Sequence, residues 1–330
     1  MSSLNAPEIV VIGGGTGSFT LLQELKEFTP NLTAIVNMSD DGGSTGILRD
    51  ELGVLPPGDI RQCLVALSDK PEVRDLFSYR FNAGTLKNQS VGNIILSALE
   101  LQYDCLEKAI EVTSSLLDIK GSVIPVTTQK HTLVMHDGEE IVRGELKITE
   151  HAIQDPDVAY LEFDPPAALN PRAADAIASA DMVVISAGNL YGSILPALHT
   201  DGIAGAIQSS KAKTVAITNL VTKPGQTDGW HVADYVHALE RAIGKDQIDR
   251  VIYNNAAPSS ELLKRYASDG EFPVATGADR MREFGAVAVG AALVADKIFH
   301  QDENDTILRR TLIRHDAVQV GRQLMRIFYE

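Results

Sequence analysis

Cysteine and long apolar runs are both scarce in this chain of 330 residues. Its two cysteines, Cys63 and Cys105, form no CxxC pair, which predicts two buried thiols in a reducing compartment. No apolar run approaches the roughly 18 residues that a membrane helix requires, and the first residues lack the basic region of a signal peptide. We therefore expect a cytoplasmic protein without a membrane span.

Positively charged residues are scarce as well. The chain has 29 Lys and Arg residues against 44 Asp and Glu residues, which gives a formal net charge of -15. A surface with this balance repels nucleic acid and anionic membranes, so neither is expected as a partner. The eight histidines show neither HxxxH nor HExxH spacing, so no zinc motif is evident. An anionic small molecule would have to be held by a local site against this overall charge.

Apolar segments of strand length recur along the chain and are separated by stretches of helical length. The strand candidates are Glu8–Ile12, Leu32–Asn37, Asp181–Ser186, Lys213–Thr218 and Asp249–Asn254. Between the first two, apolar residues recur at helical spacing, which predicts a βαβ unit. This alternation predicts an α/β fold of the Rossmann-like, doubly wound kind with a mostly parallel sheet.

The middle of the chain has a different pattern. His131–Ile148 reads HTLVMHDGEEIVRGELKI, with an Asp-Gly turn between two extended runs, which predicts a hairpin. Val158–Pro166 is a further extended piece that ends at proline. We expect a single Rossmann-like domain over residues 1–330 with a small antiparallel insertion near residues 121–166.

Glycine is concentrated where the first strand is expected to end. Val10–Ser18 reads VVIGGGTGS, a buried strand that runs into four glycines and then into a helix. Glycines let the backbone approach a phosphate closely, and a helix N-terminus offers free N–H groups. Ser18 stands where the dinucleotide-binding fingerprint has its third glycine, so that fingerprint fits only partly. A tight strand-to-helix turn is the alternative.

Two adjacent carboxylates follow the second expected strand. Asn37–Gly46 reads NMSDDGGSTG, and parallel strands end at the same edge of a sheet, so Asp40 and Asp41 should lie near the glycine loop. Mg²⁺ commonly takes one or two carboxylates together with phosphate oxygens, so the pair could hold this ion beside a bound phosphate. An exposed Asp-Asp-Gly turn is the alternative.

Two helix starts carry further candidates. In GVLPPGDIRQCL, Asp59 is placed to cap a helix, and Arg61 could reach a phosphate or form a salt bridge. In NQSVGNIILSAL, Ser90 and Asn93 could serve as caps or as donors to a ligand. The loops SAGNLYGS and TNLVTKPGQTDG follow later strands and should face the same edge of the sheet.

Taken in order, GGGTGS, NMSDDGGSTGILRDELGVLPPGDIRQCLVALSD, FSYRF, SVGNIILSAL, AGNLYGSILPAL, TNLVTKPGQT and IRHD resemble the YvcK-type gluconeogenesis factor family. That family is related to the 2-phospho-L-lactate transferases (CofD). The resemblance covers nearly the whole chain. It implies a regulator that binds UDP-N-acetylglucosamine and links carbon metabolism to cell shape and wall synthesis. The alternative is a CofD-like enzyme that moves a phospholactyl group from a guanosine diphospho donor to a deazaflavin, with Mg²⁺ on Asp40 and Asp41.

The resemblance implies a nucleotide site, to which we add Arg61 from the helix-start argument above. The full set is Gly14, Gly15, Thr16, Gly17, Asn37, Asp40, Asp41, Arg61, Ser90, Asn93, Asn189, Ser193, Tyr266 and Arg314. The first four would hold phosphates. Three positions depart from the family pattern: Gln89 replaces a common His, Gly192 a common Thr, and Gln226 the usual Glu. The expected partner is a small-molecule nucleotide or nucleotide-sugar, and a homo-oligomer is compatible with this interpretation. A catalytic role, on Asp40 and Asp41, is expected only in the transferase alternative.

Overall fold

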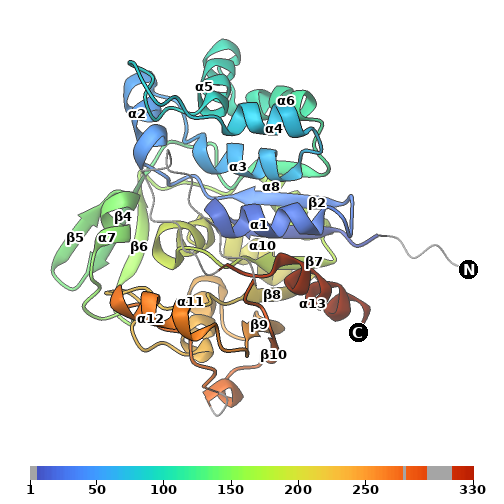
Figure 1. Ribbon diagram of the computed structural model, residues 1–330, viewed down its shortest axis with the longest axis vertical. Coiled ribbons are helices and arrows are strands. Elements are labelled where there is room, and N and C mark those ends of the chain that lie inside the picture. The colour runs from blue at the N-terminus through green and yellow to red at the C-terminus, as the bar shows by residue number, and fades with distance from the viewer. Residues whose placement is uncertain (1–5, 278–279, 296–313) are drawn as a thin grey trace, which may run out of the picture.

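The five segments expected to be strands lie in one parallel sheet of the computed structural model, which describes residues 6–277, 280–295 and 314–330 (Figure 1). Two further strands complete it, and the sheet order is β10-β9-β8-β7-β1-β2-β3. All six neighbouring pairs are parallel. The strands are β1 Ile9–Gly13, β2 Leu32–Val36, β3 Ser122–Pro125, β7 Met182–Ile185, β8 Lys213–Ile217, β9 Arg250–Asn254 and β10 Val287–Ala291.

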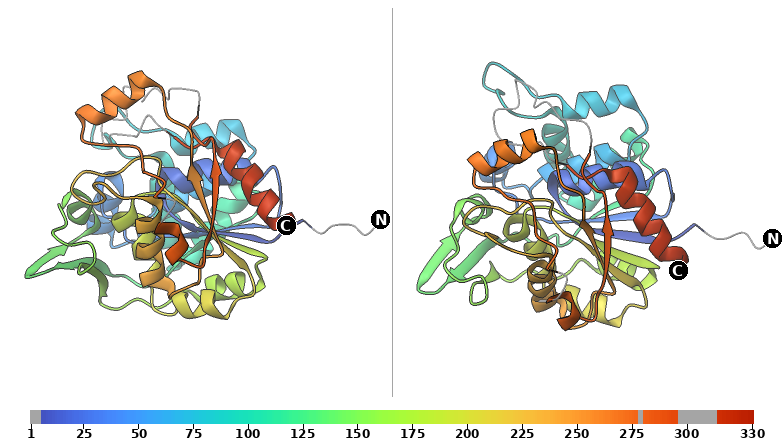
Figure 2. Two further views of the ribbon diagram at one scale, coloured as in Figure 1. Left: turned by 90° about the horizontal axis from the view of Figure 1, so that it is seen from below. Right: turned by 60° about the horizontal axis from the view of Figure 1, so that its bottom comes forward.

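Helices cover both faces of this sheet (Figure 2). In one layer α1 packs against both α3 and α13, and in the other α10 packs against both α8 and α11. The prediction of a doubly wound α/β fold is therefore confirmed. The helices are α1 Gly15–Leu25, α2 Gly43–Leu52, α3 Gly58–Leu67, α4 Pro71–Ser78, α5 Val91–Tyr103, α6 Leu106–Leu117, α7 Glu145–Glu150, α8 Pro171–Ser179, α9 Leu195–Leu198, α10 Ile203–Ser209, α11 Val232–Ile243, α12 Ser260–Ser268 and α13 Ala317–Tyr329, with a π-helix η1 Leu190–Ile194 and a 3₁₀ turn η2 Arg280–Glu283.

A separate three-stranded antiparallel sheet lies within the expected insertion, in the order β5-β4-β6 (Figure 1). It is formed by β4 Thr132–Asp137, β5 Glu140–Arg143 and β6 Tyr160–Asp164. The hairpin prediction was wrong at its far end, because the segment that follows β5 is helix α7 and not extended chain. Gly144 ends the strand with a φ of 99°. The start of the expected insertion also differs, since β3 belongs to the large sheet.

The direction of winding reverses between β1 and β7. From β1 the chain builds the sheet outward through β2 to β3, and from β7 it builds outward in the opposite direction to β10. Ligands of open α/β sheets bind in the crevice outside the carboxyl ends of the strands at such a point. The Gly14–Gly17 loop and the Ser186–Asn189 loop flank this crevice, since they follow β1 and β7.

The two loops are packed too tightly for a side chain between them. A Cβ atom on Gly17 would overlap the carbonyl oxygen of Ala187. Next to it, the buried hydroxyls of Ser18 and Ser186 lie 2.8 Å apart and share a hydrogen bond. Ser18 therefore replaces the third glycine of the dinucleotide fingerprint with a polar link between helix α1 and the loop after β7.

The structure bears on both features that are scarce in the sequence, cysteine and long apolar runs. Cys63 is buried as expected, but Cys105 is exposed because it lies just before helix α6, so the prediction of two buried thiols was wrong for Cys105. Both thiols are free. None of the described helices is both long enough and apolar enough to cross a membrane.

Replacing Gly17 by Ala should destabilise the protein, because the added methyl group must displace the Ala187 carbonyl. Overpacking of this kind costs about 1–3 kcal/mol. Urea unfolding of the variant measures the loss. Gly205→Ala in helix α10 is the matched control, since nothing lies within 4 Å of its added Cβ. Equal stability of the two variants would contradict the close packing of the β1 and β7 loops.

Candidate functional site

The glycines of the loop after β1 serve different purposes. A side chain on Gly14 would overlap the Asp59 carboxylate, so Gly14 is required for packing. Gly15 has a φ of 64°, and the nearest atom to a Cβ there is Asp59 Oδ1 at 3.9 Å. Gly15 is thus the glycine of the loop that leaves open space beside its backbone, as close approach of a phosphate requires.

Asp59 has a larger role than its expected one as a helix cap. Helix α3 begins at Gly58, so Asp59 lies inside its first turn and makes no capping bond. Its carboxyl group accepts a hydrogen bond from the backbone N–H of Gly15 and is 8% exposed. The capping prediction was wrong because the side chain is drawn to the glycine loop, 44 positions earlier in the chain by the residue numbers (59 − 15).

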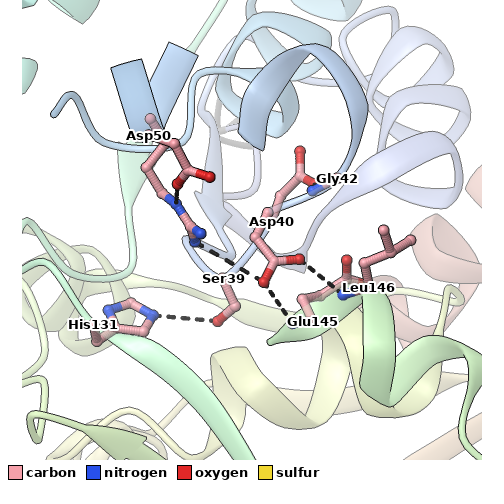
Figure 3. Close-up of polar contacts among 9 residues, drawn as sticks. Ser39, Asp40, Gly42, Asp50, His131, Glu145 and Leu146 are labelled. Atoms are coloured by element: carbon pink, nitrogen blue, oxygen red, sulfur yellow. Dashed lines mark hydrogen bonds and ion pairs between the residues drawn. The ribbon is translucent and has the colours of Figure 1, made fainter. Parts of the chain in front are cut away.

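The adjacent carboxylates after β2 hold the backbone in place. Asp41 accepts hydrogen bonds from the N–H groups of Glu145 at 3.0 Å and Leu146 at 2.8 Å, the first residues of α7 (Figure 3). Asp40 accepts from Gly42 N–H at 3.0 Å and from the hydroxyl of Thr45. Both carboxylates therefore hold the backbone, Asp41 at the start of α7 and Asp40 within its own loop. Among the described residues, no three His, Cys, Asp or Glu side chains cluster closely enough to hold a metal ion.

Helix α7 is also held at its C-terminal end. Gln226 donates its amide to the carbonyls of Ile148 at 2.7 Å and His151 at 3.1 Å. Lys223 donates to the carbonyl of Thr149 at 2.5 Å. These donors come from the loop after β8, whereas Asp41 comes from the loop after β2. Helix α7 therefore spans the crevice from one side to the other.

Carboxyl groups gather beneath this helix. Burial, with the nearby charges of Asp40 and Glu145, raises the pKa of Asp59 to about 8. Burial also raises the pKa of Glu145 to about 7, and that of Asp40 above its usual value, with neighbouring carboxylates adding to both. Lys223 faces Glu145, and burial lowers the pKa of the lysine to about 8. The site is therefore rich in acidic groups that repel one another.

Asn37 and Asn189 join the walls of the crevice. Asn37 is 2% exposed, and its amide nitrogen donates to the carbonyl of Gly192 at 3.2 Å. The amide oxygen of Asn37 is buried and has no hydrogen-bond partner. Asn189 donates to the Thr149 hydroxyl at 2.7 Å and accepts from Gly192 N–H at 3.2 Å. An unsatisfied buried acceptor such as Asn37 Oδ1 marks a place where a ligand donor would be favourable.

Ser90 and Asn93 belong to a network around Ser44. Ser90 caps α5 by accepting the Asn93 N–H at 3.1 Å, so the capping interpretation of Ser90 is confirmed. Ser44 donates to Gln89 at 2.6 Å and accepts from the Asn93 amide at 3.3 Å. Gly42–Gly46 has the GxSxG spacing of a nucleophile elbow, but amide partners cannot act as a base toward Ser44. The Asn93 amide oxygen is buried without a partner.

The remaining expected site residues fall in two groups. Thr16 lies in the first turn of α1, Arg61 is buried in α3, and Ser193 lies in η1, all at the carboxyl edge of the sheet near the crevice. Tyr266 in α12 is 6% exposed, and Arg314 precedes α13. Both lie on the β8–β9 side of the molecule, since α12 follows β9 and the residue after Arg314 bonds to the carbonyl that follows β8.

Three residues of the crevice were not expected from the sequence. Glu145 lies in the segment His131–Ile148, which was expected to be extended, and Thr149 follows that segment directly. Nothing in the sequence therefore indicated a helix that points these two side chains into the crevice. Lys223 lies in the loop TNLVTKPGQTDG, and only the position of that loop after a strand indicated that the lysine would lie near carboxylates. All three lie where α7 meets the loops that follow β7 and β8.

Asp41→Asn should loosen α7, because an amide offers one acceptor oxygen where the carboxylate offers two. A hydrogen bond to a charged group contributes about 1.5–3 kcal/mol. Hydrogen exchange of the Glu145 and Leu146 amides should therefore accelerate at least about tenfold, since 1.4 kcal/mol corresponds to a factor of ten. Asp50→Asn, at an exposed position of α2, is the control. Unchanged exchange in both variants would show that Asp41 does not anchor α7.

The pH dependence of stability should change in Asp59→Asn. The folded-state pKa of Asp59 is about 8, above its value in the unfolded chain, so stability falls as pH rises from about 4 to about 8. Asparagine stays neutral and removes this loss. The variant should gain at least about 1.4 kcal/mol relative to wild type between pH 5 and pH 8, equal to one pKa unit. Urea unfolding measures it, with exposed Asp75→Asn as control. A pH-independent difference would contradict a buried, protonated Asp59.

Comparison with known proteins gives matches along nearly the whole chain. The family model described as 2-phospho-L-lactate transferase CofD matches residues 9–294. Proteins named gluconeogenesis factor from Listeria innocua and Bacillus subtilis are 39% and 36% identical, and the alignments cover 98% of this chain and 97% and 99% of theirs. The crystal structure of a UPF0052-family protein from Bacillus halodurans has a TM-score of 0.88 and 32% identity, covering 98% of this chain and 100% of that one.

Proposed function

This chain belongs to the 2-phospho-L-lactate transferase (CofD) family, among its gluconeogenesis-factor members, and from that premise we propose that it is a regulator that binds a nucleotide-sugar. The ligand is of the UDP-N-acetylglucosamine kind. Binding couples carbon metabolism to cell shape and wall synthesis in the cytoplasm. The protein acts through the liganded state and not through catalysis.

The observation that supports this proposal most strongly is the position of Gly15. Its backbone lies at the start of α1, at the switch point of the sheet, with open space beside it. A helix N-terminus at a switch point favours the phosphates of a nucleotide. Arg61, buried in the first turns of α3, supplies a cation near the same loop, since its charge acts on Asp59.

The nucleoside is assigned to the β8–β9 side of the crevice, where Tyr266 and Arg314 lie. A guanidinium suits either a diphosphate or the face of a base.

UDP-N-acetylglucosamine should raise the melting temperature of the protein more than UDP, GDP or NAD does. At 100 times its dissociation constant a ligand stabilises the native state by about 2.7 kcal/mol, which shifts the melting temperature by roughly a few degrees in a chain of this size. Gly15→Val should abolish the shift, because its side chain fills the open space beside the loop. Differential scanning fluorimetry measures both effects.

Gly138→Val is the matched control, because Gly138 has nearly the same φ of 63° but lies in the hairpin turn between β4 and β5. It should keep the ligand-induced shift. If Gly15→Val kept the ligand-induced shift in melting temperature, the glycine loop would be a structural turn only and not a phosphate site. A shift produced by guanosine nucleotides alone, and only with Mg²⁺ present, would instead support a phospholactyl-type transferase.

A further inference from the structure

We infer that Glu145 makes the crevice select a neutral sugar over an acidic one. This inference rests on the proposed function and assigns a specificity role to one residue of its site. Glu145 is then a specificity-determining residue of the crevice. The inference follows from the hydrogen-bond acceptors in the crevice that have capacity left for a ligand.

Polar groups converge at Gly192, in the π-helix after β7. A Cβ atom at this position would lie 2.5 Å from the amide nitrogen of Asn189 and 2.6 Å from the hydroxyl of Thr149, and it would overlap a carboxylate oxygen of Glu145. The absence of a side chain at Gly192 therefore gives the Glu145 carboxylate room beside the loop that follows β7. The carbonyl of Gly192 bonds to Asn37, which places Glu145 on the same wall as Asn37.

Hydrogen-bond acceptors exceed donors on this wall. The amide nitrogen of Asn37 is fixed on the Gly192 carbonyl, so its other atom must be the oxygen, and that oxygen has no partner. The carboxylate of Glu145 accepts from the Thr149 hydroxyl at 2.7 Å, which leaves its remaining lone pairs free for a ligand. A group that fits here must supply donors, as sugar hydroxyls do.

Charge favours the same class of ligand. Asp40 and Asp59 lie close enough to Glu145 for their charges to act on one another. Lys223 is the cation that faces Glu145, and its ammonium group is already bonded to the Thr149 carbonyl. A carboxylate on the ligand would bring no donor and would add a further negative charge to this cluster. Like charges brought together in a buried site are strongly unfavourable.

UDP-glucose and UDP-glucuronate test the inference, because they differ only in a hydroxymethyl group replaced by a carboxylate. Isothermal titration at pH 8.5 in EDTA keeps Glu145 charged and keeps divalent cations from bridging carboxylates. The wild-type protein should bind UDP-glucose at least about tenfold more tightly, because like-charge contacts are costly. Glu145→Gln should narrow the difference to about threefold, mainly by improving the binding of UDP-glucuronate.

Glu150→Gln is the matched control, since it removes one exposed negative charge from the other end of α7 and should leave the wild-type preference intact. Equal wild-type affinity for the two nucleotides would overturn the inference alone. So would a Glu145→Gln protein that is folded by its melting temperature but keeps the full preference. Failure of both nucleotides to bind the wild-type protein would overturn the proposed function and the inference with it.

Discussion

The crevice depends on one contact, in which the Asp41 carboxylate accepts hydrogen bonds from the first N–H groups of α7. A helix of six residues is not stable by itself, so α7 exists because other elements hold it. An anion at its N-terminus and the Lys223 ammonium at its C-terminus both suit the helix dipole. Since the two groups come from loops on opposite sides of the switch point, α7 bridges the crevice and directs Glu145 toward the glycine loop.

The glycine loop is constrained by packing before any ligand is considered. Gly14 and Gly17 have no room for a side chain, against Asp59 and the Ala187 carbonyl. Gly15 alone of these three combines a positive φ with open space. The same short segment therefore joins β1 tightly to β7 and leaves one backbone position accessible, which is what a phosphate site at a switch point requires.

Local pattern was enough to predict the five central strands. Four of them are apolar runs buried in a parallel sheet, and β9 is buried at its apolar centre, Val251 and Ile252. It failed for β10, whose residues Val287–Ala291 are mostly exposed and include a glycine. It failed also for α7, where GELKI alternates as a strand would. The helical state of that segment depends on Asp41, more than 100 residues earlier in the chain, and no local pattern can report such a contact.

The site was predictable in the same uneven way. Residues that follow strands, such as Gly15, Asn37 and Asn189, come together at one edge because the fold requires it. Asp59 and Glu145 reach the crevice from helices, so their side-chain direction depends on tertiary packing and not on position after a strand. The acidic character of the crevice was therefore underestimated from the sequence, although the nearby Asp40 and Asp41 hinted at it.

A crystal structure of the protein with UDP-N-acetylglucosamine would test the central claim most directly. We predict that the phosphates lie in the open space beside Gly15, at the start of α1, and that the sugar hydroxyls bond to Asn37 Oδ1 and Glu145 beneath α7. A ligand seated instead outside the β1–β7 crevice would contradict this account. One example is the cavity of about 320 Å³ between Arg49, Lys130 and His131, behind the Asp40–Asp41 loop.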